Sequence, residues 1–243
     1  MNRLKFIVLV AFLAVSTSSF AQFGKLLDKA KAVATGNTTL LNPSDIATAL
    51  KQALEQGTSK SADLLSKENG FFGNDAVKIL FPPEALKAEA TLRKLDLDKM
   101  CDDAILSFNR AAEDAAKQAK PIFISAVKNM TVTDAKNILI GSNDAATNYF
   151  KTNTIDSLSK VFDPVVEKSI EKVGATKYYS NVVDRYNKIP FVNKINPDLK
   201  AYITQKAIDG LFKEIAQEEL KIRENPAFRT TDLMQKVFSS VKK

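Results

Sequence analysis

Residues 109–150 read NRAAEDAAKQAKPIFISAVKNMTVTDAKNILIGSNDAATNYF, and this stretch decides the fold that we expect. Leading into it, apolar residues recur at steps of three or four, at Leu97, Cys101, Ile105, Phe108, Ala112, Ala115, Ala119 and Ile122. Such spacing puts them on one face of a helix. After Phe108 the face narrows to alanine, whose small side chain lets a neighbour come close. We therefore expect a tight helix crossing between Ala111 and Ala119.

Turn signals divide the rest of the stretch into further helices. Thr131, followed three residues later by Asp134, has the pattern of a capping box. Gly141 is expected to end that helix in the left-handed conformation. The polar turn that follows starts another helix, with Asp144 near its positive end.

The polar side of the first helix carries Asn109, Arg110, Glu113, Asp114 and Lys117. Arg110 with Asp114, and Glu113 with Lys117, are spaced i,i+4, where opposite charges meet on a helix surface. In one interpretation this is an ordinary solvated face. In the other, Asn109, Arg110 and Glu113 turn toward a neighbouring helix, because asparagine is a poor residue for a helix interior unless its side chain is bonded. The three would then form a buried polar network or line a pocket.

The remaining chain repeats helical spacing between Gly and Pro breaks. We expect an all-α, single-domain multi-helix bundle of about eight to ten helices over residues 44–243. One short extended segment is expected near residues 77–82, because a residue before proline avoids the helical region. The sequence offers that segment no partner strand.

The N-terminus has the form of a secretory signal peptide, residues 1–21. A basic start precedes the apolar run Phe6–Val15, and small residues lead to a cleavage site that we place after Ala21. Residues 22–43 are expected to form a short helix and a linker. The apolar run is too short to span a bilayer comfortably. We therefore expect a periplasmic, soluble protein with no transmembrane segment in the mature chain.

Composition argues against several classes of function. The chain has no His, no Trp and one Cys, Cys101, so it lacks the residues of a Ser-His-Asp triad and of the usual zinc sites. No nucleotide-binding glycine motif appears. The net charge of +7 becomes +5 without Arg3 and Lys5 and is spread along the chain, so nucleic-acid binding is not expected. We expect no cofactor and no metal.

Two further polar runs are candidates for a site. Asp144, Thr147 and Tyr149 surround a predicted helix start, either as ordinary capping residues or as groups converging on a ligand. Arg223 and Arg229 flank the start of the last predicted helix. They either bind an anion or carboxylate, or pair with acidic residues (Glu113, Asp144 or Asp232) and hold the C-terminal helix in place.

These polar runs carry a family resemblance. NRAAE at 109–113, DAATNYF at 144–150 and RENPAFRTTDL at 223–233 resemble the signature runs of a bacterial family called domain of unknown function 4197. The similarity runs from about Ser44 to Phe238. The chain departs from the family pattern at Ala49, Asp96 and Asp98, where glycine is common. The resemblance implies an exported, mostly helical bacterial protein and implies no particular activity.

Our leading hypothesis is a non-enzymatic envelope protein that binds a small ligand or a protein partner through a polar site between helices. The candidate ligand-binding residues are Asn109, Arg110, Glu113, Asp144, Thr147, Tyr149, Arg223, Asn225, Arg229 and Asp232. One alternative is a hydrolase that uses Glu113 and Asp144 as paired carboxylates. Another is a structural protein whose polar cluster is only a buried clamp.

Overall fold

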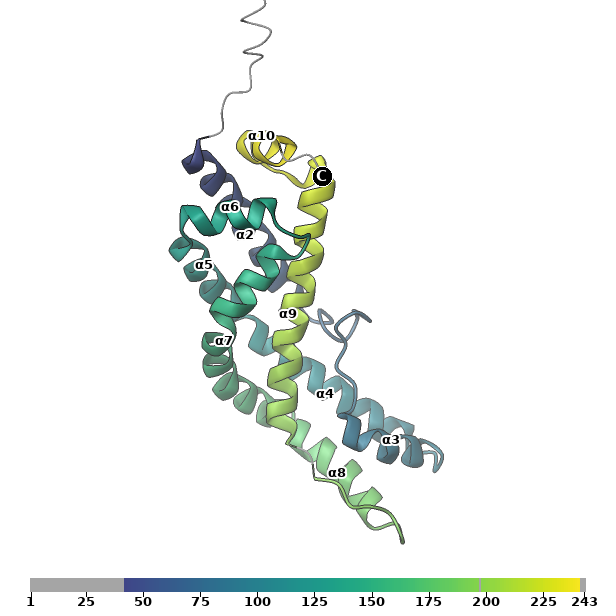
Figure 1. Cartoon of the computed structure of the whole chain (residues 1–243). Helices are drawn as coiled ribbons and strands as arrows, with labels where there is room; N and C mark the ends of the chain where they lie inside the picture. The colour runs from purple at the N-terminus through teal and green to yellow at the C-terminus, as the bar shows by residue number, and fades with distance from the viewer. Residues whose placement is uncertain (1–41, 197, 241–243) are drawn as a thin grey trace, which may run out of the picture. The chain divides into compact units, whose positions relative to one another are not determined.

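The computed structural model describes residues 42–196 and 198–240, and this part is all-α, without strands. Its helices, in chain order, are α2 (Pro43–Leu65), η1 (Pro83–Ala85), α3 (Leu86–Arg93), α4 (Asp98–Ala116), α5 (Ala119–Asn129), α6 (Val132–Ile140), α7 (Ala145–Lys172), α8 (Ala175–Asn187), α9 (Leu199–Glu224), η2 (Pro226–Phe228) and α10 (Asp232–Ser240). These nine α-helices of the described part confirm the predicted all-α fold (Figure 1). The predicted signal peptide, and the predicted helix and linker up to residue 41, lie outside the described residues.

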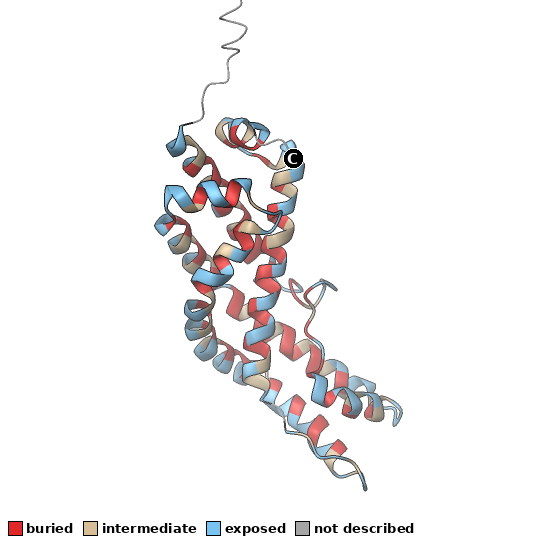
Figure 2. Cartoon of the chain, in the orientation of Figure 1, coloured by how far each residue is buried: buried red, intermediate tan, exposed pale blue. Residues whose placement is uncertain are grey.

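The long helix α9 packs against three other long helices of the described part. It contacts α7 along its length and also α2 and α4. Its fully buried face includes Ile203, Ala207 and Leu211. Figure 2 shows the buried residues turned inward on each of these helices and the exposed residues turned outward. The core thus lies between the amphipathic faces, as helical spacing requires.

The alanine face of α4 lies at the centre of this packing. Ala111, Ala112, Ala115 and Ala116 have no exposed surface, and α4 contacts α7, α8 and α9. Small side chains let these helices approach closely. The complete burial of these alanines therefore agrees with the close packing predicted for this segment.

Helix ends agree with the sequence in part. The predicted capping box is confirmed, because Asp134 N–H donates to Thr131 Oγ1 at 3.1 Å and Thr131 N–H donates to Asp134 Oδ2 at 2.9 Å. The left-handed stop predicted at Gly141 is wrong, since its φ is −76°. Helix α2 begins at Pro43, one residue before the predicted domain start, with Asn42 as its N-cap.

The connection between α2 and α3 contains the predicted non-helical segment near residues 77–82. Phe71, Ile79 and Phe81 of this connection are buried. A Cβ on Gly210 of α9 would lie 2.6 Å from the Phe71 ring, so only glycine lets this ring pack there. The connection is therefore packed into the core although it forms no regular structure.

Within residues 42–196 and 198–240, no helix is long and apolar enough to cross a membrane.

Candidate functional site

Asn109, Arg110 and Glu113 hold the irregular connection against α4, and we call these contacts the loop clamp. The Asn109 side chain is fully buried. Its Oδ1 accepts from Ile79 N–H at 2.8 Å, and its Nδ2 donates to Ile79 O at 2.8 Å and to Ile105 O at 2.7 Å. The amide thus bonds both backbone groups of Ile79, as a neighbouring strand would. This explains why an asparagine is placed inside the helix.

The Glu113 carboxylate completes the loop clamp. Its Oε1 accepts from the N–H groups of Phe71 and Phe72, both at 3.1 Å. Its Oε2 accepts from Arg110 at 2.6 Å, and Arg110 also donates to Glu68 and Asn69. The i,i+4 pairs predicted for this face are wrong: the observed pairs are Arg110–Glu113 and Asp114–Lys117, at i,i+3.

Contacts with other parts of the chain explain why the predicted i,i+4 pairs do not form. Glu113 is only 4% exposed and turns to the connection. Asp114 accepts a hydrogen bond from Ser169 of α7 at 2.7 Å. Hydrogen bonds from Lys117 and Ser169 lower the pKa of Asp114.

A second set of polar contacts joins α6, α7 and α9, and we call it the helix-end clamp. Glu219 of α9 accepts from Ala146 N–H, Thr147 N–H and Thr147 Oγ1, each at 2.9 Å. Arg223 donates to the same carboxylate at 2.8 Å, and also to Leu139 O at 3.2 Å and Ile138 O at 2.8 Å. One ion pair therefore satisfies the unpaired N–H groups at the start of α7 and carbonyls at the end of α6.

Arg229 makes a third set of contacts, at the C-terminal end of α9. It donates to the carbonyl oxygens of Ile222 and Arg223, both at 2.9 Å, and to Ser239 Oγ at 3.2 Å. Its guanidinium also lies 5.6 Å from the centre of the Phe238 ring. Burial lowers the pKa of Arg229. The prediction that Arg229 pairs with an acidic residue does not match these contacts, because carbonyl oxygens are its partners.

The other candidate residues lie apart from these three sets. Asp144 is exposed and accepts from Ser142 Oγ at 2.5 Å, and this hydrogen bond lowers its pKa. Tyr149 donates to Asp134 at 3.5 Å. Asn225 is exposed and accepts from Ala227 N–H. Asp232 is exposed in the first turn of α10.

The candidate residues therefore do not form one shared cluster. Thr147 and Arg223 come together through Glu219. Glu113 and Asp144 share no partner: one is buried against the Phe71–Phe72 backbone, and the other is at the surface.

The helix-end clamp borders an apolar cavity of about 20 Å³ between α2, α7, α9 and α10. Its walls include Leu54, Gly57, Ile222 and Phe238, with Glu219 and Arg223 among the lining residues. A cavity of this volume holds about one water molecule. Among the described residues, no group of three or more Cys, Asp or Glu side chains is placed to hold a metal ion.

Sequence reasoning missed Glu219 because a glutamate inside a long helix looks like part of a solvated face. One signal was available: Glu219 precedes Arg223 by four residues, the spacing of an ion pair. Nothing in the local sequence indicates that its carboxylate caps α7. Gly57 of α2 packs against this part of α9, since a Cβ added there would contact Glu218 and Ile222.

Comparison with known proteins gives one match. The sequence model of a family described as "Protein of unknown function (DUF4197)" matches residues 40–239. No curated protein and no solved structure matches the chain.

Proposed function

The chain belongs to the DUF4197 family, and from that premise we propose a non-enzymatic protein, exported to the bacterial periplasm, that binds a ligand between its helices. The observation that carries this proposal is the cavity where apolar side chains of α2, α9 and α10 meet the Glu219–Arg223 pair. Ligand sites combine such an apolar lining with a few fixed polar groups. The ligand that this lining suits is small and largely apolar.

The size of the cavity sets a condition on binding. Room for about one water molecule does not accommodate a metabolite. Phe238, on the short helix α10, forms one wall. A ligand therefore enters if α10 moves away from α2 and α9, which makes α10 the mobile cover of the site in this proposal.

The surroundings of the carboxylates support the non-enzymatic part of the proposal. A general acid or base must reach the substrate with a free lone pair or proton. Both oxygens of Glu113 and of Glu219 already accept hydrogen bonds from the chain itself. The hydrolase alternative based on Glu113 and Asp144 has less support, because these residues share no partner.

A structural role for the clamps is the second candidate, favoured by the same hydrogen bonds. Asn109, Glu113, Glu219 and Arg229 each bond backbone groups of irregular segments or helix ends. In that case these residues support the fold, and no ligand enters the cavity.

Binding of an uncharged fluorescent dye, N-phenyl-1-naphthylamine, tests the ligand proposal. Wild-type protein is expected to bind the dye with increased emission. Gly57→Leu, which fills the cavity, is expected to lose binding while the helical circular dichroism spectrum stays unchanged. Gly57→Ala is a milder variant, since its Cβ would lie 3.6 Å from Glu218 Cβ and 3.9 Å from Ile222 Cδ1, which are ordinary contacts.

The matched control is Ala201→Leu, a similar enlargement on the exposed face of α9. It is expected to bind the dye as the wild type does. If wild-type protein does not bind the dye, or Gly57→Leu binds it equally well, the cavity is not a ligand site and the structural alternative stands.

Export is tested separately. Protein released from expressing bacteria by osmotic shock is expected to begin at Gln22. An N-terminus at Met1, or retention in the cytoplasmic fraction, would refute the export proposal without bearing on the cavity.

A further inference from the structure

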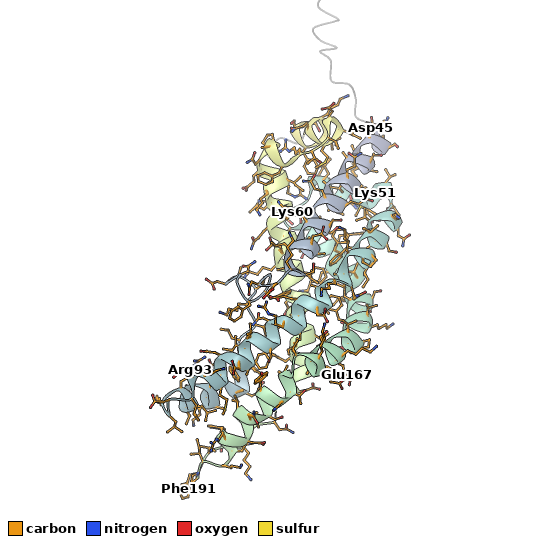
Figure 3. The ribbon with its side chains drawn as sticks, turned by 180° about the vertical axis from the view of Figure 1, so that it is seen from behind. Asp45, Lys51, Lys60, Arg93, Glu167 and Phe191 are labelled. Atoms are coloured by element: carbon orange, nitrogen blue, oxygen red, sulfur yellow. The ribbon has the colours of Figure 1, made fainter. Side chains whose placement is uncertain are left out.

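The connection between α8 and α9 carries the most exposed large apolar side chain in the described part of the chain. Phe191 is fully exposed, with a relative accessibility of 107%. Figure 3 shows it at the very end of the molecule, directed away from the helices. Its φ is +65°, a conformation that bulky residues rarely adopt and that persists only where the surroundings hold it.

The base of this connection is closed by one side chain. Asn187, the last residue of α8, donates through Nδ2 to Ile195 O at 3.1 Å, and its Oδ1 accepts from Ile195 N–H at 3.0 Å. Ile189 N–H donates to the carbonyl of Tyr186, which is buried. The residues between these bonds form a loop, 188–194, that projects Phe191 from a fixed base.

The charged residues of the loop itself are all basic, although the exposed Asp184 precedes it and Glu84 and Asp198 line the same surface hollow as Lys194. From Arg185 to Ile195 the chain reads RYNKIPFVNKI, with Arg185, Lys188 and Lys194 and no acidic residue. All three cations are exposed, and none forms an ion pair within the described residues. An exposed aromatic ring bracketed by unpaired lysines is complementary to an anionic, partly apolar surface.

The helix before the loop and its neighbour α3 also carry exposed apolar side chains. Leu86 of α3 and Tyr178 of α8 are exposed, and α3 packs on α8. Figure 1 shows the α8–α9 connection and the far end of α3 extending in the same direction. The acidic residues near this end are neutralised in part, since Asp98 and Asp102 pair with Arg93.

We propose that loop 188–194 docks the protein on an anionic phospholipid surface, with Phe191 inserted at the level of the headgroups and Lys188 and Lys194 against lipid phosphates. A membrane fits better than a protein partner, because the loop projects as a convex tip and needs only a soft surface of opposite charge. This docking is independent of the cavity beneath α10 and does not depend on the proposed ligand.

A single tryptophan tests the insertion directly, because the chain contains none. Phe191→Trp protein, purified with whatever N-terminus the cell leaves, is mixed with vesicles of phosphatidylcholine alone or with phosphatidylglycerol added. Its emission is expected to shift to shorter wavelength only with phosphatidylglycerol, and to be quenched when the lipids carry bromine on their acyl chains. Ile140→Trp, at another exposed apolar position, is expected to show neither change.

Sedimentation with the same vesicles measures how much the aromatic ring and the lysines contribute to binding. Phe191→Ala is expected to lower the partition coefficient about tenfold, which corresponds to ~1.4 kcal/mol. The double variant Lys188→Gln, Lys194→Gln is expected to lose about tenfold or more at low salt, whereas Lys151→Gln, Lys168→Gln on the exposed face of α7 changes binding little.

Three results would overturn the proposal. One is wild-type protein that fails to bind phosphatidylglycerol vesicles. Another is a Phe191→Trp emission that vesicles do not shift. The third is equal binding by Phe191→Ala and the wild type, which would mean that another part of the chain makes the contact.

Discussion

The loop clamp and the helix-end clamp use the same chemistry for different purposes. In each, a buried glutamate accepts hydrogen bonds from two adjacent backbone N–H groups and from one arginine. The N–H groups belong to Phe71 and Phe72 for Glu113, and to Ala146 and Thr147 for Glu219. The first fixes an irregular connection, whereas the second joins the ends of two helices. A buried carboxylate can therefore bond adjacent N–H groups either in an irregular turn or at the start of a helix.

The arginines of the two clamps differ in burial, and we therefore expect the clamps to contribute differently to stability. The Arg223 side chain is 5% exposed, whereas that of Arg110 is 25% exposed. A buried charge that loses its partner costs far more than an exposed one. We therefore expect the helix-end clamp to contribute more to stability than the loop clamp does.

Removing Glu219 is expected to have the largest effect. Glu219→Ala leaves the buried Arg223 guanidinium and two helix N–H groups without their partner, and should lower the free energy of unfolding by ~3–5 kcal/mol. Urea denaturation followed by circular dichroism measures this. Glu171→Ala, an exposed glutamate of α7, is the control and should change stability by less than about 0.5 kcal/mol. Equal effects would mean that Glu219 contributes no more than a surface residue.

Asn109→Ala is expected to come next, at ~2–3 kcal/mol, because it leaves the buried N–H and C=O of Ile79 unbonded. Hydrogen exchange at the Ile79 amide should accelerate more than exchange in α9. Asn153→Ala is the matched control, since this exposed asparagine also bonds the carbonyl four residues earlier. If Ile79 keeps its protection, the amide does not hold the connection.

Glu113→Gln tests the loop clamp more gently, since the amide keeps the shape and one acceptor oxygen. We expect a loss of ~1–2 kcal/mol, and a melting temperature lower by about 2–4 °C for each kcal/mol in a chain of this size. Differential scanning calorimetry measures both. An unchanged or higher melting temperature would indicate instead that Glu113 is retained for function at the expense of stability.

Arg110→Gln is expected to have the smallest effect, below about 1 kcal/mol, because the side chain is partly exposed and Glu113 keeps its two backbone donors. Arg223→Gln, measured in the same way, should be clearly more destabilising. Similar losses for the two variants would contradict the ranking of the clamps by burial.

The sequence predicted the fold better than the site. The helical spacing up to Ala116, the capping box at Thr131 and Asp134, and the non-helical segment near residues 77–82 were recoverable. The predicted helical face did not continue to Ile122, because the chain turns at Lys117 and Gln118 before α5. The site was not recoverable, because the sequence does not show whether three polar runs that lie far apart along the chain meet in the folded protein. They were expected to share one pocket, and they instead stabilise separate parts of the fold.

The errors have a common origin. Gly141 does not adopt the left-handed conformation, and the carbonyls of Ile138 and Leu139 near that helix end accept from Arg223. Asp144 makes no side-chain cap to α7, because Glu219 already occupies the first N–H groups. In both cases a local rule was overridden by a side chain from α9.

The sequence by itself determined the family, the helices and the residues that could form polar contacts. Helical spacing and capping depend on residues within four positions of one another, so the sequence displays them directly. The tertiary structure alone decided which polar groups meet. Glu219 lies more than 70 residues from Ala146 and Thr147, and only the packing of α9 on α7 brings its carboxylate to their N–H groups.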